Sequence, residues 1–227
     1  MRKLWLGYLL SVSIVAIPVG IITLFQLFLG KISFFSDDIQ KWTSFHVMGL
    51  MLFQAIIFLT MIVLVYRIFR PDFFHWNGSV SFKEIVLGIS GLILINIIAK
   101  LIMDLMHVEA TQFEELNKVL LKKNSVVFIL TVAGFAPIYE EIVFRGFILR
   151  ILWPSKNNIY LKAGAVLFTS FLFSLIHFDL DAAIPIFLLS LYLSIWTIIK
   201  KNIFLSIVIH STQNFIASVA FLYLNIG

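Results

Sequence analysis

The amino-acid sequence predicts an all-α fold, a polytopic membrane protein with about seven transmembrane helices. Of its 227 residues 61% are hydrophobic and only 13% are charged, and the mean hydropathy is +1.03. A soluble domain could not cover its surface with so few charged groups. Apolar runs recur at about 20 residues, the length that a helix needs to cross a bilayer. They lack the period-two alternation of a membrane β-barrel, so a helical bundle is expected.

Seven apolar runs follow one another without an internal repeat, a low-complexity tract or a flexible linker, so we expect one domain, residues 1–227. The predicted spans are Leu4 to Leu29, Phe45 to Phe69, Ile85 to Met103, Val126 to Leu149, Leu161 to Phe178, Ala182 to Ile199 and Ile203 to Leu224. The first is longer than a signal-peptide core, so we expect it to be retained, with a kink at Pro18. Ser81 and Glu84 predict a capping box before the third span, and residues 104–123 a short interfacial helix.

Lys and Arg lie mainly between the spans, where they orient a membrane protein. The formal net charge of +5 and the pI near 9.5 therefore do not indicate nucleic-acid binding. With the N-terminus inside, the inner segments hold Arg2, Lys3, Arg67, Arg70, Lys83, Arg150, Lys156, Lys162, Lys200 and Lys201, and the outer ones Lys31, Lys41, Lys100, Lys118, Lys122 and Lys123. This excess predicts an inside N-terminus and an outside C-terminus. The absence of cysteine excludes disulfides, thiolate metal ligands and a cysteine nucleophile.

The fourth span contains two adjacent carboxylates, Glu140 and Glu141, and Arg145 is the only other charged residue between Ser125 and Leu149. Carboxylates within a span are costly and mark a functional site by default. Glu141 and Arg145 are spaced i, i+4 and share a helix face, whereas Glu140 projects about 100° away. A structural ion pair between Glu141 and Arg145 is the plain alternative. It leaves Glu140 without a partner.

Two histidines in later spans could supply that partner. His177 ends the fifth span, and His210 lies inside the seventh, where Asn214 follows it at i+4 on the same face. A single intramembrane histidine is more often an interhelical hydrogen-bonding residue, but two of them with a lone glutamate favour a site. The remaining histidines, His46, His75 and His107, lie at span ends or in loops and are expected to be bystanders.

Pro137 gives a local reason for a polar pocket beside Glu140. Proline cannot donate a backbone hydrogen bond, so we expect the helix to be broken or kinked just before Glu140, near Gly134. Broken helices at membrane depth are tolerated where they line a polar cavity. An ordinary proline kink is the alternative.

These residues resemble three motifs of the CAAX protease and bacteriocin-processing family, also called CPBP or Abi-type. Glu140, Glu141 and Arg145 match E-E-x-x-x-R, Phe173 to His177 matches F-x-x-x-H, and His210 to Asn214 matches H-x-x-x-N. All three occur in the family's order and within spans. The resemblance implies a catalytic core at about residues 124–224 and an intramembrane endopeptidase that acts on a membrane-associated peptide or protein.

The resemblance also implies roles for the residues. Glu140 would be the general base that activates water, and His177 would assist it or bind a metal. His210 and Asn214 would stabilise the oxyanion or complete the site, with Glu141, Arg145 and Phe173 in support. Zinc is a possible cofactor, since Glu140, His177 and His210 could equally form a three-ligand site with an open position. Both metal-dependent and glutamate-dependent mechanisms stay open.

The biological role rests on weaker signals. Small size, short loops and abundant Phe, Ile, Lys and Asn are typical of a bacterial protein from an AT-rich genome. We therefore expect a multi-pass protein of the bacterial plasma membrane, with bacterial peptide processing or bacteriocin self-immunity as its role. Two alternatives are a non-proteolytic membrane scaffold or regulator and a proton-coupled transporter, the latter disfavoured by the lack of repeated halves. The sequence does not indicate an oligomeric state.

One conflict concerns depth in the membrane. In a simple seven-span arrangement His177 falls near the outer end of its span and His210 in the inner third of its own, a mismatch of roughly 10 Å at 1.5 Å per residue. Either the fifth span is displaced inward or the connection from Asp179 to Asp181 is buried in the protein. We prefer the second explanation, which makes Asp179 a secondary site candidate.

Overall fold

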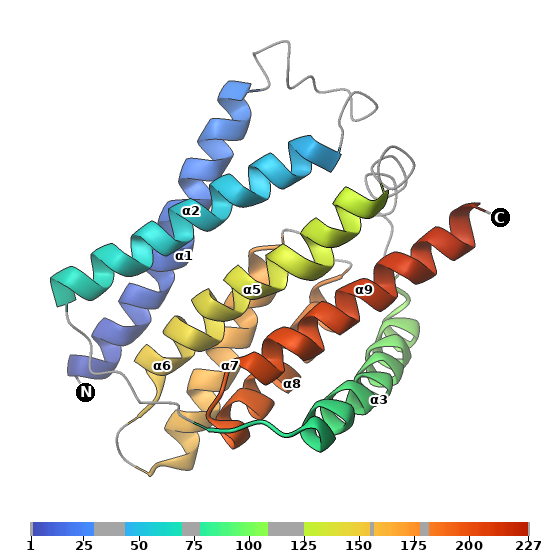
Figure 1. Cartoon of the computed structure of the whole chain (residues 1–227). Helices are drawn as coiled ribbons and strands as arrows, with labels where there is room; N and C mark the ends of the chain where they lie inside the picture. The colour runs from blue at the N-terminus through green and yellow to red at the C-terminus, as the bar shows by residue number, and fades with distance from the viewer. Residues whose placement is uncertain are drawn as a thin grey trace.

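The computed structural model describes residues 2–29, 44–69, 78–108, 125–154, 157–177 and 182–226, and within these ranges it contains helices and no strands. The first three helices are α1 (Arg2–Leu29), α2 (Ser44–Phe69) and α3 (Phe82–Met106). A composite helix over Ser125–Leu152 follows, and after it come α7 (Ile159–Leu175), α8 (Ala183–Lys200) and α9 (Phe204–Ile226). Figure 1 shows them packed as a bundle, with α7 and α8 behind the composite helix.

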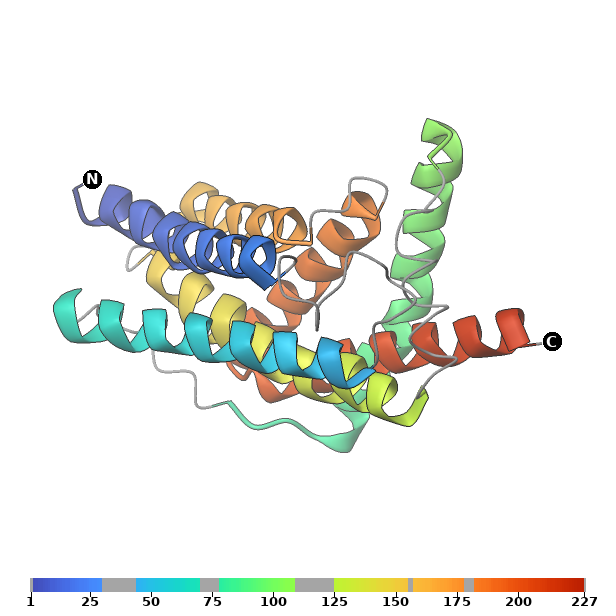
Figure 2. The ribbon, with the colours of Figure 1, turned by 90° about the horizontal axis from the view of Figure 1, so that it is seen from above.

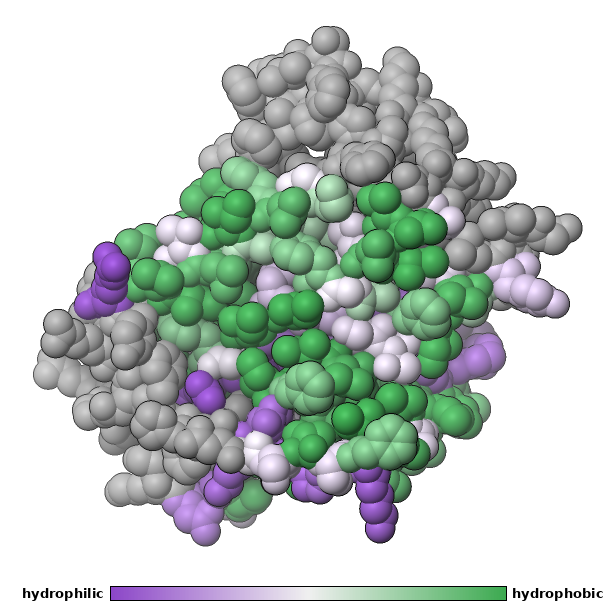
Figure 3. All heavy atoms as spheres, viewed as in Figure 1, coloured by the Kyte–Doolittle hydropathy of each residue, from purple (hydrophilic) through white to green (hydrophobic). Residues whose placement is uncertain are grey.

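The predicted all-α membrane fold is confirmed, and the predicted spans end within three residues of the observed helix ends. By length and composition, four of the described helices could cross a membrane: α3, the composite helix, α8 and α9. The apolar described parts of α1, α2 and α7 are shorter, at 10–17 residues. Apolar side chains cover much of the molecular face seen in Figure 3, and hydrophilic groups gather along its lower edge.

Several predictions fall on residues outside the described ranges. They include the interfacial helix expected within 104–123, and His75 and Asp179. The capping box lies within them and is confirmed, because the Ser81 N–H donates to Glu84 Oε2 at 2.7 Å. Helix α1 continues through Pro18. Inside and outside are not assigned by the structure, so the orientation of the termini stays a prediction.

The composite helix lies at the centre of the bundle, which explains why it can carry charged side chains. Half of its most apolar 18-residue window is buried, against 17–28% for the other three long spans. Phe144, Ile148 and Leu152 pack with Leu10 and Ile14 of α1 and with residues of α7 in the main core. A second core joins α3, α8 and α9 through Leu92, Leu193, Leu205 and Ile209. Viewed from above, α3 extends away from the rest of the bundle (Figure 2).

One end of α3 is attached to the turn between α8 and α9. The Gly78 N–H donates to the Lys201 carbonyl at 3.1 Å, and Asn202 Nδ2 donates to the Gly78 carbonyl at 2.6 Å. Lys200 and Glu84 form an ion pair beside these bonds. A Cβ at position 78 would lie 1.6 Å from the Lys200 carbonyl oxygen, so this approach of two backbones requires glycine.

Replacing Gly78 with alanine is therefore expected to force the two backbones apart and break this attachment. We expect Gly78→Ala to lower stability by about 1–3 kcal/mol, as overpacking commonly does, measured by thermal unfolding in detergent. Gly20→Ala is the matched control, since a Cβ there meets nothing within 4 Å. Equal unfolding temperatures for the two variants would contradict the requirement for glycine.

Candidate active site

The two glutamates close a short α-helical stretch between two π-helical turns. The composite helix contains η2 (Leu130–Phe135), α5 (Ala136–Glu141), η3 (Ile142–Ile148) and α6 (Leu149–Leu152). We expected a break or a kink near Gly134. The helix is not broken there, and its backbone widens into η2 over this stretch. π-helical turns are rare and are often found at functional sites.

Pro137 and Asn214 explain the widened turn before the glutamates. The Ala136 N–H donates to the Thr131 carbonyl, five residues earlier, so the next bond in this register would join residue 137 to the Val132 carbonyl. Proline has no N–H to donate. Asn214 Nδ2 on α9 donates to the Val132 carbonyl instead, at 2.9 Å. The asparagine side chain therefore takes the place of the missing backbone donor and ties α9 to this helix.

Glu141 and Arg145 form the ion pair that their spacing predicts. Arg145 Nη1 lies 2.7 Å from Glu141 Oε1, and both side chains have no exposed surface. Arg145 Nη2 donates to Oγ and to the carbonyl of Ser190 on α8, at 2.7 and 2.9 Å. The guanidinium also lies over the Phe173 ring, 4.7 Å from its centroid. Such a buried charge is tolerated only with this degree of pairing.

His210 lies between the two glutamates. Its Nδ1 is 3.0 Å from Glu141 Oε1, and its Nε2 is 3.8 Å from Glu140 Oε2. The sequence assigned His210 to Glu140, but the structure places it against Glu141 as well. A hydrogen bond from Nδ1–H to Glu141 orients the ring and turns Nε2 toward Glu140. Glu141 therefore accepts hydrogen bonds from both Arg145 and His210.

His177 lies just beyond the end of α7 and is half-buried. Its Nδ1 is 2.7 Å from the Phe173 carbonyl, and this contact holds the ring in place. The Phe173 ring contacts both imidazoles, with centroid separations of 4.9 Å to His177 and 5.8 Å to His210. Phe173 thus links the two histidines that the simple span arrangement placed at different depths. The preferred explanation, burial of Asp179 to Asp181, lies outside the described residues.

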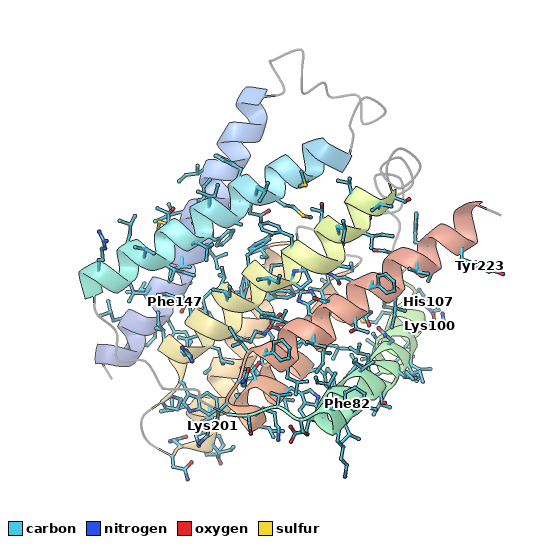
Figure 4. All side chains as sticks on the ribbon, viewed as in Figure 1. Phe82, Lys100, His107, Phe147, Lys201 and Tyr223 are labelled. Atoms are coloured by element: carbon cyan, nitrogen blue, oxygen red, sulfur yellow. The ribbon has the colours of Figure 1, made fainter. Side chains whose placement is uncertain are left out.

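We expected the remaining histidines, His46, His75 and His107, to lie away from the site. His107 follows α3 with a left-handed backbone, φ 54°, and Figure 4 labels it on the far side of the bundle from Phe147 of the composite helix. The side chain of His46 and all of His75 lie outside the described residues.

Sequence reasoning missed Ser190, which makes two hydrogen bonds to Arg145. A lone serine in an apolar span carries no motif, and only its spacing from Ser194 and Thr197, at i+4 and i+7, could have signalled a polar face. For metal binding, the described part of the chain contains no group of three His, Asp or Glu side chains close enough to hold an ion.

The surroundings of the two carboxylates give them different chemical capacities. Glu141 is fully enclosed and occupied by Arg145 and His210, whereas the Glu140 side chain is 11% exposed. Pairs of carboxylates in different environments commonly divide the work of a proton acceptor and a fixed charge. Glu140 thus keeps a small exposed surface and lies beside His210 Nε2.

Asn214 supplies the hydrogen bond that Pro137 cannot donate, and a double-mutant cycle can test this replacement. We expect Asn214→Ala to cost about 1–2 kcal/mol of unfolding free energy, because it leaves the partly buried Val132 carbonyl unpaired. In a Pro137→Ala background the cost should fall, since alanine supplies a backbone N–H. Unfolding in mixed micelles measures both. An identical cost in the two backgrounds would disprove the replacement.

Comparison with known proteins gave a match for the segment that holds this site. Residues 122–216 match the family model described as type II CAAX prenyl endopeptidase Rce1-like. No curated protein and no solved structure matched the chain. Glu140, Glu141, Arg145, Phe173, His177, Ser190, His210 and Asn214 all lie inside the matched segment. Residues 122–216 are thus similar to the Rce1-like family of type II CAAX prenyl endopeptidases, which is consistent with the resemblance to the CAAX protease and bacteriocin-processing family.

Proposed function

We propose that the protein is an intramembrane endopeptidase in which Glu140 and His210 activate a water molecule to cleave a peptide bond. The family match over residues 122–216 supports a membrane endopeptidase at the level of the family. The observation that carries the mechanism is the approach of Glu140 Oε2 and His210 Nε2 to 3.8 Å, within a buried helix bundle.

The separation of these two atoms suits an enzyme that acts on water. At 3.8 Å they are too far apart for a direct hydrogen bond, and contacts of this length are commonly bridged by water. Glu140 would accept a proton as the water oxygen forms a bond with the peptide carbonyl carbon. The C–N bond then breaks, and Glu140 returns the proton to the leaving nitrogen.

The histidines would act on the charge that develops during the attack. His210 is oriented by Glu141, so its ring can lie against the oxyanion without rearrangement. His177 is oriented by its Nδ1 contact with the Phe173 carbonyl, which leaves Nε2 for substrate. Asn214 completes the site by holding the widened turn, and Arg145 keeps Glu141 charged.

A three-ligand zinc site does not fit the donors as they are placed. Such a site would need Glu140, His177 and His210 together, and the described residues hold no group of three potential ligands. The mechanism is therefore derived from the chain's own acid and base groups.

The substrate is proposed by class. A site buried among spanning helices favours a peptide or protein that itself lies in or on the bilayer. We propose a bacterial role in peptide processing or bacteriocin self-immunity at the plasma membrane.

The catalytic roles predict graded losses of activity. Glu140→Gln and His210→Ala should each lower the cleavage rate about 10²–10⁴-fold, the usual contribution of general acid–base groups, and His177→Ala should also lower it. The assay uses quenched fluorescent peptides, prenylated and unprenylated, in vesicles containing purified protein. His107→Asn is the control and should keep full activity. If all three site variants insert normally and cleave like the wild type, these residues do not catalyse the cleavage. If the correctly inserted wild type cleaves none of the peptides, the scaffold or regulator is favoured.

Metal removal separates the two mechanisms that the family resemblance left open. Because the donors do not form a three-ligand site, we expect protein dialysed against a strong chelator to keep at least half of its cleavage rate. Metal analysis of the same sample gives the zinc content. Loss of activity on chelation, with recovery on adding zinc, would reject the metal-free mechanism while leaving the endopeptidase assignment in place.

A further inference from the structure

Three buried hydroxyls on α7 and α8 lack hydrogen-bond partners. Thr169 and Ser170 on α7 and Ser194 on α8 are fully buried, and none of their side-chain oxygens has a partner in the described structure. Hydroxyls on other helices, and that of Thr197 on α8, behave differently. Those of Ser11, Thr131, Thr197 and Thr212 donate to the carbonyl four residues earlier. The three unpartnered hydroxyls are therefore exceptions that require a cause.

Their positions converge on one region of the bundle. Helices α7 and α8 are antiparallel neighbours joined by a hydrogen bond from Ser174 Oγ to the Ala183 carbonyl at 2.8 Å (Figure 1). Ser170 lies one turn from Ser174 on the face toward α8. Thr169 lies one turn before Phe173, and Ser194 one turn after Ser190. Phe173 and Ser190 both contact Arg145.

The antiparallel arrangement puts Thr169 and Ser194 at the same level. Each lies four residues from its Arg145 contact, about 6 Å along its helix. Both displacements run toward the end of the bundle that holds Ile159 and Lys200. Arg145 Nε is also buried without a partner. Four unpartnered polar groups thus lie on adjoining faces of three helices.

We propose that this region is a buried hydration site, in which water molecules bind between α7 and α8 beside Arg145. Thr169, Ser170, Ser194 and Arg145 Nε supply the two to four polar partners that a buried water normally has. The water solvates the edge of the guanidinium that neither Glu141 nor Ser190 contacts. Thr197, three residues after Ser194, extends the line of hydroxyls toward Lys200 and the exposed Lys201.

The hydration site has a consequence for catalysis, and only this consequence rests on the proposed function. A solvated Arg145 stays charged without a second carboxylate, which keeps Glu141 charged and His210 oriented. The presence of the water depends on the unpartnered groups alone.

The natural chain contains no cysteine, so a single introduced thiol gives the only S–H stretching band in its infrared spectrum. Ser194→Cys and Thr169→Cys place the thiol in the hydration site. Leu193→Cys is the matched control, because Leu193 is the adjacent residue, is equally buried and packs among Leu92, Leu205 and Ile209. Each variant is transferred to D₂O, and conversion of S–H to S–D is followed over time.

We expect the thiol at position 194 or 169 to exchange at least ten times faster than the thiol at position 193. Thr169→Cys serves as the second variant if Ser194→Cys does not fold. Equally slow exchange at all three positions would overturn the hydration site. Repeating the measurement in Glu140→Gln protein should give the same rates, so that loss of the hydration site and loss of proteolysis are separate results.

Discussion

The buried ion pair between Glu141 and Arg145 is the interaction on which the site depends. Both side chains are entirely enclosed, so bulk solvent does not reach either charge. Removing one partner of such a pair commonly costs about 3–5 kcal/mol, because the other charge is left unpaired. Neighbouring helices must therefore supply the other contacts of the two charged groups. Ser190 on α8, Phe173 on α7 and His210 on α9 contact the pair, which makes one helix the centre to which three others are fitted.

The ion pair also separates the roles of two adjacent glutamates. Because Arg145 and His210 both occupy Glu141, that carboxylate serves as a fixed charge that orients the imidazole. Glu140, one residue earlier, points elsewhere and is slightly exposed. A carboxylate in a poorly hydrated region interacts strongly with whatever approaches it, since few water dipoles compete. The same enclosure that makes Glu141 costly therefore strengthens the electrostatic interactions of Glu140.

The widened turn before Pro137 fixes the position of α9 relative to the glutamates. Pro137 removes one backbone donor, and in a membrane an unpaired carbonyl has no solvent to bind. The helix widens into a π-helical turn, and Asn214 of α9 pairs with the free Val132 carbonyl. His210 is four residues before Asn214 on the same helix face, so the bond that repairs the backbone also sets the distance of His210 from the glutamates.

The sequence alone determined the helical membrane fold and the positions of its spans, and it singled out the candidate site residues, because continuous apolar runs and costly intramembrane charges are local properties. It also determined the pairing of Glu141 with Arg145, which depends only on spacing within one helix. The tertiary structure decided the contacts between helices. His210 lies against both glutamates, Asn214 binds a backbone carbonyl, and Ser190 binds Arg145. None of these follows from spacing, because each depends on how distant helices turn and pack against one another.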